Sequence, residues 1–232
     1  MNEAEFDLVA DEYEIQHRRN IAITGEGPEF FAHHKISVLA NFASGLLPAP
    51  ARILDFGSGI GNSIPFFRKY FPNASLTCAD ASSRSIELSR KRFPGQEHYT
   101  FIAGDKIPLE DNAFDVTFSA CVFHHIPHED HHHWLTELLR VTRSGGSLVI
   151  FEHNPLNPLT VRTVHQCPFD ENARLIKAKE FVARCRESGW KDPKAQYHLF
   201  FPHALSGLRT LEPYLSGIPF GGQYSVTAIK SD

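Results

Sequence analysis

The chain has 232 residues, of which 42% are hydrophobic and 12% aromatic, and this is enough apolar material for one substantial core. Its net charge of −4 and its dispersed Lys and Arg residues exclude the basic surface of a nonspecific nucleic-acid binder. No apolar run has the length of a membrane span, and the acidic start, Met1 to Glu5, lacks the features of a signal peptide. We therefore expect a single cytoplasmic domain over residues 1–232.

A glycine-rich loop follows the first predicted strand. The apolar run that begins at Ala51 ends at Asp55 and Phe56, and three glycines then alternate at Gly57, Gly59 and Gly61. Glycines let the backbone turn tightly and approach a ligand, and the helix that follows points its amide donors at the same place. The Asp55 carboxylate repels a pyrophosphate and attracts a cation. The loop therefore predicts a ligand that is partly cationic.

Strands and helices alternate after this loop. Apolar residues at helical spacing predict helices over 62–71 and 86–93, and a third through Trp134 to Thr142 that ends at Gly145-Gly146. The predicted strands between them are Ser75–Ala79, Tyr99–Ala103, Asp115–Cys121 and Ser147–Phe151. Such alternation predicts a parallel sheet with helices on both faces, and ligands then bind outside the carboxyl ends of the strands.

The last part of the chain has a different pattern. A helix capped near Gly189 precedes two predicted strands, Gln196–Phe201 and Tyr224–Lys230, which can join the sheet as a hairpin-like edge. Two segments fit no regular element well, namely the first forty residues and the stretch from Asn154 to Asp170. Loops of that length in a compact domain usually serve as lids or binding loops.

Residues 50–152 resemble the class I S-adenosylmethionine-dependent methyltransferases, because the motifs occur in the family's order. The resemblance implies an α/β fold, a doubly wound, Rossmann-like sheet of seven mostly parallel strands with an antiparallel last strand. It implies a helical amino-terminal lid over 1–45, a cofactor-binding core over 50–152, and a substrate-side insert with closing strands over 153–232.

The same resemblance implies S-adenosylmethionine as cofactor. Asp55 and the glycine loop would hold its methionine part, Asp80 its ribose hydroxyls, and Asp105 and Ile107 its adenine. The expected cofactor-binding residues are Tyr13 in the lid, Asp55, Phe56, Gly57, Ser58, Gly59, Gly61, Asp80, Ala81, Gly104, Asp105, Lys106, Ile107, Ala120 and Cys121. The physical fit is good, since one acid suits the ammonium, backbone amides suit the carboxylate, and a second acid suits the ribose diol.

Histidines at two strand ends are candidates for the acceptor side. The run Val122 to Ile126 resembles the segment that follows the fourth strand in small-molecule methyltransferases, so we consider His124 and His125 as a general base or as residues that orient the substrate. His125 and His153 are candidate substrate contacts. The alternatives are structural histidines at 124 and 125, and at 153 a turn fixed by Pro155.

Neither the cysteines nor the cluster of histidines and acids from His124 to His133 predicts a metal site. The cysteines, Cys78, Cys121, Cys167 and Cys185, are widely spaced, and we expect reduced thiols with a packing role. The sequence His128-x-Asp130-His131 echoes part of the metallo-β-lactamase pattern His-x-His-x-Asp-His, but Ile126 stands at the first histidine position. On the predicted helix, His132 and His133 lie off the apolar face, so we expect them to be solvated.

The leading hypothesis is methyl transfer from S-adenosylmethionine to oxygen, nitrogen or carbon of a small-molecule metabolite by in-line displacement. One alternative is an S-adenosylmethionine-binding regulatory or partner subunit without catalysis, which would form no S-adenosylhomocysteine. Another is an NAD-dependent oxidoreductase, whose fingerprint needs a glycine at position 62, where the chain has Asn62. We expect no nucleic-acid partner and no membrane span, and the sequence predicts neither the substrate nor the oligomeric state.

Overall fold

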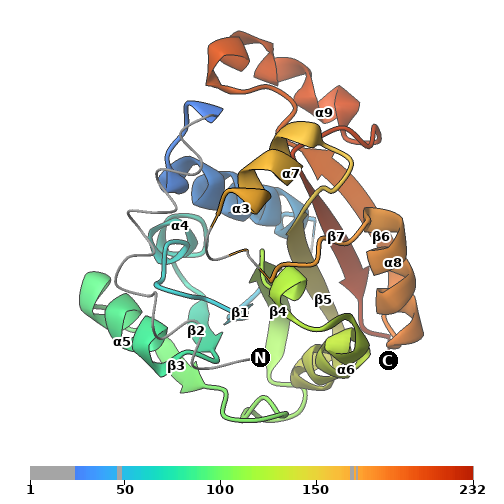
Figure 1. The fold of residues 1–232 in the computed structure, drawn as a ribbon. Coiled ribbons are helices and arrows are strands. Elements are labelled where there is room, and N and C mark those ends of the chain that lie inside the picture. Colours follow the sequence, from blue (N-terminus) through green and yellow to red (C-terminus); the bar gives the residue numbers. More distant parts are fainter. Residues whose placement is uncertain (1–23, 46–48, 168–169, 171, 232) are drawn as a thin grey trace.

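Figure 1 shows the computed structural model of the chain, which describes residues 24–45, 49–167, 170 and 172–231. In this part of the chain the strands form a seven-stranded sheet in the order β3-β2-β1-β4-β5-β7-β6. The strands are Arg52–Phe56 (β1), Ser75–Asp80 (β2), His98–Phe101 (β3), Phe114–Ala120 (β4), Thr142–His153 (β5), Lys191–His198 (β6) and Gln223–Ile229 (β7).

Strand direction confirms the predicted mixed sheet. The pairs β3-β2, β2-β1, β1-β4 and β4-β5 are parallel. The last strand, β7, pairs antiparallel with both β5 and β6. The sheet is therefore doubly wound and mostly parallel, with an antiparallel last strand, as predicted.

Helices cover both faces of this sheet (Figure 1). The α-helices are Pro28–Ala43 (α3), Ile64–Tyr70 (α4), Ser83–Arg92 (α5), His131–Val141 (α6), Pro158–His165 (α7), Ala178–Glu187 (α8) and Glu212–Leu215 (α9). Short 3-10 helices occupy Phe123–His125 (η2), His128–Asp130 (η3) and His203–Leu211 (η5). No helix in the described ranges is both long and apolar enough to cross a membrane.

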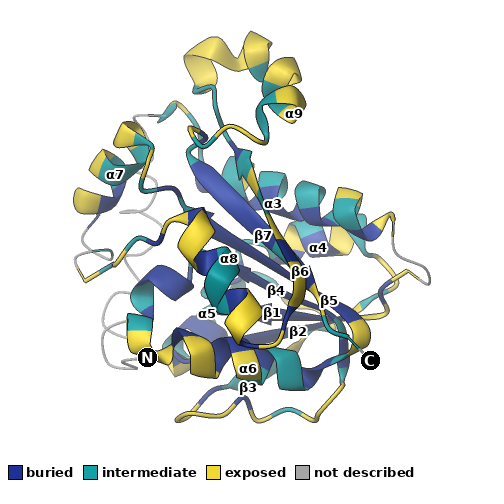
Figure 2. Cartoon of the chain, turned by 90° about the vertical axis from the view of Figure 1, so that its right-hand side faces the viewer, coloured by how far each residue is buried: buried dark blue, intermediate teal, exposed yellow. Residues whose placement is uncertain are grey.

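Alternating strand residues build two apolar clusters, one on each face of the sheet. Leu54 and Ile150 pack in the cluster that includes the apolar sides of α6 and α8. Ile53 and Val149, their neighbours in sequence, pack in the cluster that includes α3 and α4. This alternation follows from the two-residue repeat of a strand, and a strand buried on both faces is apolar at every position. Figure 2 shows the resulting buried strands between helices with exposed outer sides.

The largest differences from the predicted boundaries are in α6, β5 and β6. The helix α6 ends at Val141 rather than at the glycine pair, because Thr142 is extended and already pairs with Phe114 of β4. The glycines lie inside β5, where a register shift in β4 accommodates them. The strand β6 starts earlier than predicted and ends at His198, since Leu199 has a left-handed backbone (φ 65°).

Both segments predicted as irregular contain a helix. The amino-terminal segment carries α3, whose buried residues include Ile36 and Leu39, and the Asn-Pro-rich stretch carries α7. Asn157 caps α7, because its side chain accepts a hydrogen bond from the Thr160 amide. Both helices lie near the carboxyl ends of the strands, where β1, β2, β4 and β5 open onto one cavity.

Candidate functional site

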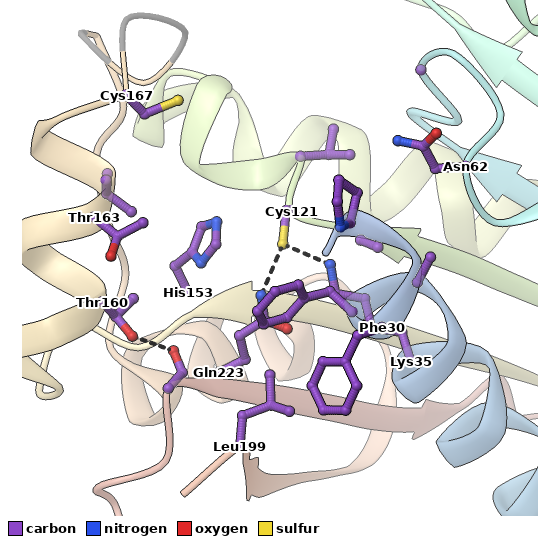
Figure 3. Close-up of a pocket in the computed structure, with 18 of the residues that line it drawn as sticks. Phe30, Lys35, Asn62, Cys121, His153, Thr160, Thr163, Cys167, Leu199 and Gln223 are labelled. Atoms are coloured by element: carbon purple, nitrogen blue, oxygen red, sulfur yellow. Dashed lines mark hydrogen bonds between the residues drawn. The ribbon is translucent and has the colours of Figure 1, made fainter. Parts of the chain in front are cut away.

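A cavity of about 310 Å³ lies at the carboxyl ends of the parallel strands, a volume in the range of small-molecule sites. It brings together many of the predicted residues: Asp55, Gly57, Ser58, Gly59, Asp80, Ala81, Ala120, Cys121, His124, His125 and His153. Figure 3 shows residues from α3, β4, β5, α7 and β7 facing it. The chain elements on both sides of the predicted strand ends therefore contribute to one site.

The glycine loop has the open backbone that a bound cofactor needs. Gly57, Gly59 and Gly61 all have positive φ angles, of 73°, 53° and 82°. A Cβ on Gly57 would lie 2.3 Å from Val122, whereas no described atom lies within 4 Å of a Cβ placed on Gly59. Gly57 is thus required by packing, and Gly59 leaves its backbone accessible from the cavity.

Asp55 is a buried carboxyl group at the floor of this loop, and only 3% of the residue is exposed. Burial and the nearby charge of Asp80 raise its pKa to about 7, while Lys35 acts in the opposite direction. A carboxylate that is costly to ionise in the empty site gains most from a bound cation. This environment fits the ammonium group of S-adenosylmethionine.

Asp80, the last residue of β2, is hydrogen-bonded to the glycine loop. Its two carboxylate oxygens accept hydrogen bonds from the amides of Gly59 (2.7 Å) and Ser82 (2.8 Å). A carboxylate oxygen accepts more than one hydrogen bond, so the same group can also accept from ribose hydroxyls. Asp80 therefore links the position of the loop to the predicted ribose site.

The other predicted cofactor residues lie outside the lining of the cavity. Phe56 and Ile107 are fully buried in the apolar core. Gly104, Asp105 and Lys106 are exposed, and the Asp105 carbonyl accepts a hydrogen bond from His133. Gly61 packs against the side chain of Ser89. Tyr13 lies outside the described residues.

His124 is held between two carboxylates. Its Nδ1 donates a hydrogen bond of 2.6 Å to Glu152 Oε2, and its Nε2 lies 3.5 Å from Asp170 Oδ1. Burial alone would lower the pKa of His124, but Glu152 and Asp170 outweigh it and raise that pKa well above its usual range. Burial and the charge of His124 lower the pKa of neighbouring His125 to about 3, so His125 stays neutral and is a weak base.

A second polar group surrounds Cys121 at the end of β4 (Figure 3). Lys35 Nζ donates to its Sγ at 3.1 Å, and Gln223 Nε2 lies 3.7 Å from it. Burial alone would raise the pKa of the thiol, but His153 and Lys35 outweigh it and lower that pKa to about 6. Packing alone therefore does not describe Cys121, which lines the cavity as predicted and whose thiol has a lowered pKa.

Sequence reasoning missed Lys35, Asp170 and Gln223. Each of these residues contacts side chains from distant parts of the chain. The sequence pattern therefore could not predict their contacts. His131 is a further residue whose role the sequence did not predict, and it is fully buried. Its Nε2 donates to the carbonyls of Phe123 and Ile126, which fixes η2 below the cavity.

Comparison with known proteins gives consistent matches. The model of a methyltransferase domain matches residues 54–150. The demethylmenaquinone methyltransferase of Thermotoga maritima is 29% identical over 154 residues, which cover 66% of this chain and 61% of the relative. The trans-aconitate 2-methyltransferase of Rhodopseudomonas palustris is 29% identical over 134 residues, 57% of this chain and 51% of the relative. The matched segment thus spans less than two thirds of these relatives.

Solved structures show the same fold at lower identity. The structure of a SAM-dependent methyltransferase from Thermotoga maritima has a TM-score of 0.66 at 20% identity and covers 99% of both chains. Phosphoethanolamine N-methyltransferase 2 from Haemonchus contortus, in complex with phosphomonomethylethanolamine and S-adenosylhomocysteine, has a TM-score of 0.66 at 17% identity and covers 97% of this chain and 58% of the other. The matched domain identifies residues 54–150 as a methyltransferase domain, and the solved structures, the strand order and the glycine loop show that the chain has the class I S-adenosylmethionine-dependent methyltransferase fold.

Proposed function

We propose that this protein transfers the methyl group of S-adenosylmethionine to an oxygen, nitrogen or carbon atom of a small molecule. The observation that carries this proposal is one cavity lined by two sets of residues. Asp55 and Gly59 come from β1 and the loop after it and define what we call the cofactor end, and His124, His125 and His153 come from the ends of β4 and β5 and define the acceptor end. A methyl donor and an acceptor can therefore meet in the same enclosed space.

The cofactor end supplies complementary charge for each part of the donor near the methyl group. Asp55 would bind the ammonium, the loop amides the carboxylate, and Asp80 the ribose hydroxyls. Lys35 adds a cation beside Asp55, suited to the donor's carboxylate. The roles of Tyr13 and of the adenine segment 104–107 remain predictions.

The acceptor end has apolar walls. The apolar side chains that line the cavity include Phe30, Phe31, Leu159, Leu199 and Phe200. Gln223 is a polar residue in the same lining. It is only 6% exposed, and its Oε1 has no hydrogen-bond partner among the described residues. Such a wall supports an acceptor with an apolar body and one hydrogen-bond donor. A small-molecule acceptor also agrees with the two relatives, which are named for demethylmenaquinone and trans-aconitate.

Methyl transfer needs alignment more than acid–base machinery. The acceptor atom attacks the methyl carbon opposite the sulfonium, the bond to sulfur breaks, and S-adenosylhomocysteine leaves. The cavity walls align the two reactants and exclude water. Where the acceptor is a hydroxyl, its proton must also be removed.

Titration calorimetry with S-adenosylmethionine and S-adenosylhomocysteine tests the cofactor assignment. The variants Asp55→Asn and Asp80→Asn should each bind about 10- to 100-fold more weakly than the parent protein, the loss expected for one hydrogen bond to a charged group. Asp130→Asn is the control, because Asp130 is exposed and its side chain does not cap α6. Undetectable binding by the parent protein would rule out the proposal.

Turnover separates an enzyme from a binding subunit. Incubation with S-adenosylmethionine and pools of small metabolites should produce S-adenosylhomocysteine above the level without a pool. Cofactor binding with no product from any pool would instead favour the regulatory or partner subunit.

A further inference from the structure

We propose that His124, His125 and Asp170 bind one divalent transition-metal ion, best suited to Zn²⁺, at the acceptor end of the cavity. These three residues form the one group with metal-ligand spacing found among the described residues. All three line the cavity of the proposed methyltransferase. This proposal departs from the expectation of no metal site, which could not include Asp170 because it lies far along the chain from the two histidines.

The distances match those between ligands of one ion. Asp170 Oδ1 lies 3.5 Å from His124 Nε2 and 3.4 Å from His125 Nε2. Two ligands bound at about 2.0–2.2 Å with tetrahedral angles lie roughly 3.4 Å apart. One ligand atom from each residue lies within 4.8 Å of the others. A metal ion therefore needs small side-chain movements to contact all three, and it must displace the proton that Asp170 and Glu152 stabilise on His124.

The contacts of Asp170 with the two histidines are long for hydrogen bonds, although Asp170 still accepts from His124 and raises the pKa of that histidine. A well-formed N–H···O bond has a donor–acceptor distance of 2.7–3.2 Å, and both contacts to Asp170 are longer. By contrast, the bond from His124 Nδ1 to Glu152 is 2.6 Å. The carboxylate of Asp170 thus lies between two imidazole nitrogens at a separation that suits a shared ion.

Glu152 orients His124 for this task. Its Oε1 accepts hydrogen bonds from the amides of Val122 and Phe123, at 3.0 and 2.8 Å, and its Oε2 holds Nδ1 of His124. This leaves Nε2 directed at Asp170. A carboxylate that holds the second nitrogen of a ligand histidine is a recurring support of metal sites, where it fixes the ring and its tautomer.

The segment that carries Asp170 is joined to the histidines. The Arg174 amide donates to the carbonyl of His124 at 2.8 Å, and the Asp170 amide donates to the Cys167 carbonyl at 3.0 Å. These backbone bonds place Asp170 opposite η2. His153 and Cys167, labelled in Figure 3, lie along the same part of the cavity.

The donor set selects the class of ion. Two imidazole nitrogens and one carboxylate oxygen suit Zn²⁺ and its first-row neighbours, whereas Mg²⁺ and Ca²⁺ prefer oxygen ligands. Three protein ligands leave coordination positions for other molecules. The added positive charge is balanced by the carboxylates of Glu152 and Asp170.

This site would define the acceptor class, a step that rests on the proposed function. A bound metal ion lowers the pKa of a coordinated hydroxyl group. An acceptor that offers a hydroxyl or phenol oxygen to the ion would be both positioned and made easier to deprotonate. The proposed acceptor is therefore an oxygen nucleophile with an apolar body.

Metal titration tests the site without any methyl transfer. The full chain is freed of metal with a chelator and titrated with Zn²⁺ by calorimetry and with Co²⁺ by visible absorption. The parent protein should bind one equivalent of each, and Co²⁺ should show the intense visible bands of low coordination. The variants Asp170→Asn and His125→Gln should lose this binding, and Glu152→Gln should weaken it about 10- to 100-fold.

His132→Gln is the matched control, because His132 is exposed on α6 and is not part of the group. It should bind both ions like the parent protein. Circular dichroism of Asp170→Asn checks that the fold is kept. A parent protein that binds no Zn²⁺, or ligand variants that bind it as tightly as the parent, would overturn the proposal.

Titration with S-adenosylmethionine separates the two proposals. Cofactor binding by a protein that takes up no metal would overturn the metal site and leave the methyltransferase proposal standing. Metal binding that Asp170→Asn removes, in a protein that binds no S-adenosylmethionine, would support the metal site and overturn the methyltransferase proposal.

Discussion

Asp55 couples cofactor binding to pH. Its pKa is raised to about 7 in the empty site, and only the ionised carboxylate can pair with the cofactor's ammonium. Below pH 7, binding must therefore release a proton, and the affinity falls. We expect the dissociation constant for S-adenosylmethionine to be roughly tenfold higher at pH 6 than at pH 8. Calorimetry at both pH values measures this ratio.

Asp55→Asn is the control for this pH effect, because it removes the titrating group and keeps the shape of the side chain. Its affinity should be lower at both pH values but nearly independent of pH between them. The same dissociation constant at pH 6 and pH 8 in the parent protein would contradict the role of Asp55.

Gly57 and Gly59 differ in what an added methyl group would meet. In Gly57→Ala the new Cβ collides with Val122, and in Gly59→Ala it enters open space beside the cavity. Both backbones are left-handed, which costs alanine about 1–2 kcal/mol. We expect Gly57→Ala to lose more thermal stability, and Gly59→Ala to lose cofactor affinity with a smaller change in melting temperature. Equal effects on stability would contradict the packing difference.

The helix α3 places the positively charged side chain of Lys35 at the cavity. The sequence did not predict this contribution. Lys35 is only 9% exposed and donates to Cys121. The pKa of the Cys121 thiol is about 6 because of His153 and Lys35. Iodoacetamide should therefore alkylate Cys121 with a rate that reaches half its maximum near pH 6, as measured by mass spectrometry of the modified peptide.

Lys35→Met should shift this pH profile upward, because the thiolate loses a nearby positive charge while burial still opposes its ionisation. Cys78 and Cys185 are internal controls, since both are buried and burial raises their pKa values. An unchanged profile in Lys35→Met would show that Lys35 does not stabilise the thiolate.

Local patterns explain which elements could be predicted. The strands β1, β2 and β4 and the loop at Gly57 have apolar runs with clear ends, so sequence alone located them, and Asp55, Gly57, Gly59 and Asp80 line the cavity. The helix α3 lies in the segment for which the family resemblance implied helix, whereas its residue pattern did not show one, and α7 was missed because prolines surround it. The acceptor end needs contacts between Asp170 and His124 and between Lys35 and Cys121. Such long-range contacts leave no periodic signal in the chain.

At the scale of the whole molecule, a half-buried and a buried histidine join the amino-terminal helix to the closing strands. His34 of α3 and His198 of β6 meet edge to face, with ring centroids 5.4 Å apart. Burial and the charge of His198 lower the pKa of His34 to about 3, and burial lowers the pKa of His198 to about 4. Both rings therefore stay neutral in the folded protein well below their ordinary titration range.

This pair should make the fold sensitive to acid. In the unfolded chain each histidine takes up a proton below its ordinary pKa of 6.5, whereas the folded protein resists protonation. The unfolded state thus binds more protons between about pH 6.5 and pH 4, and the free energy of unfolding falls by about 1.4 kcal/mol per pH unit for each such histidine. Above pH 6.5 both states are neutral, so this contribution is constant.

Urea unfolding from pH 8 to pH 4 measures this dependence, and His34→Phe isolates one of the two protons. Phenylalanine keeps a ring beside Phe30 and His198 and cannot titrate. The acid slope of the variant should be smaller than that of the parent protein by about 1.4 kcal/mol per pH unit, with no difference in slope above pH 6.5. His132→Gln, at an exposed position, should retain the parent slope. Parallel curves for His34→Phe and the parent protein would mean that His34 takes up its proton equally in the folded and unfolded states.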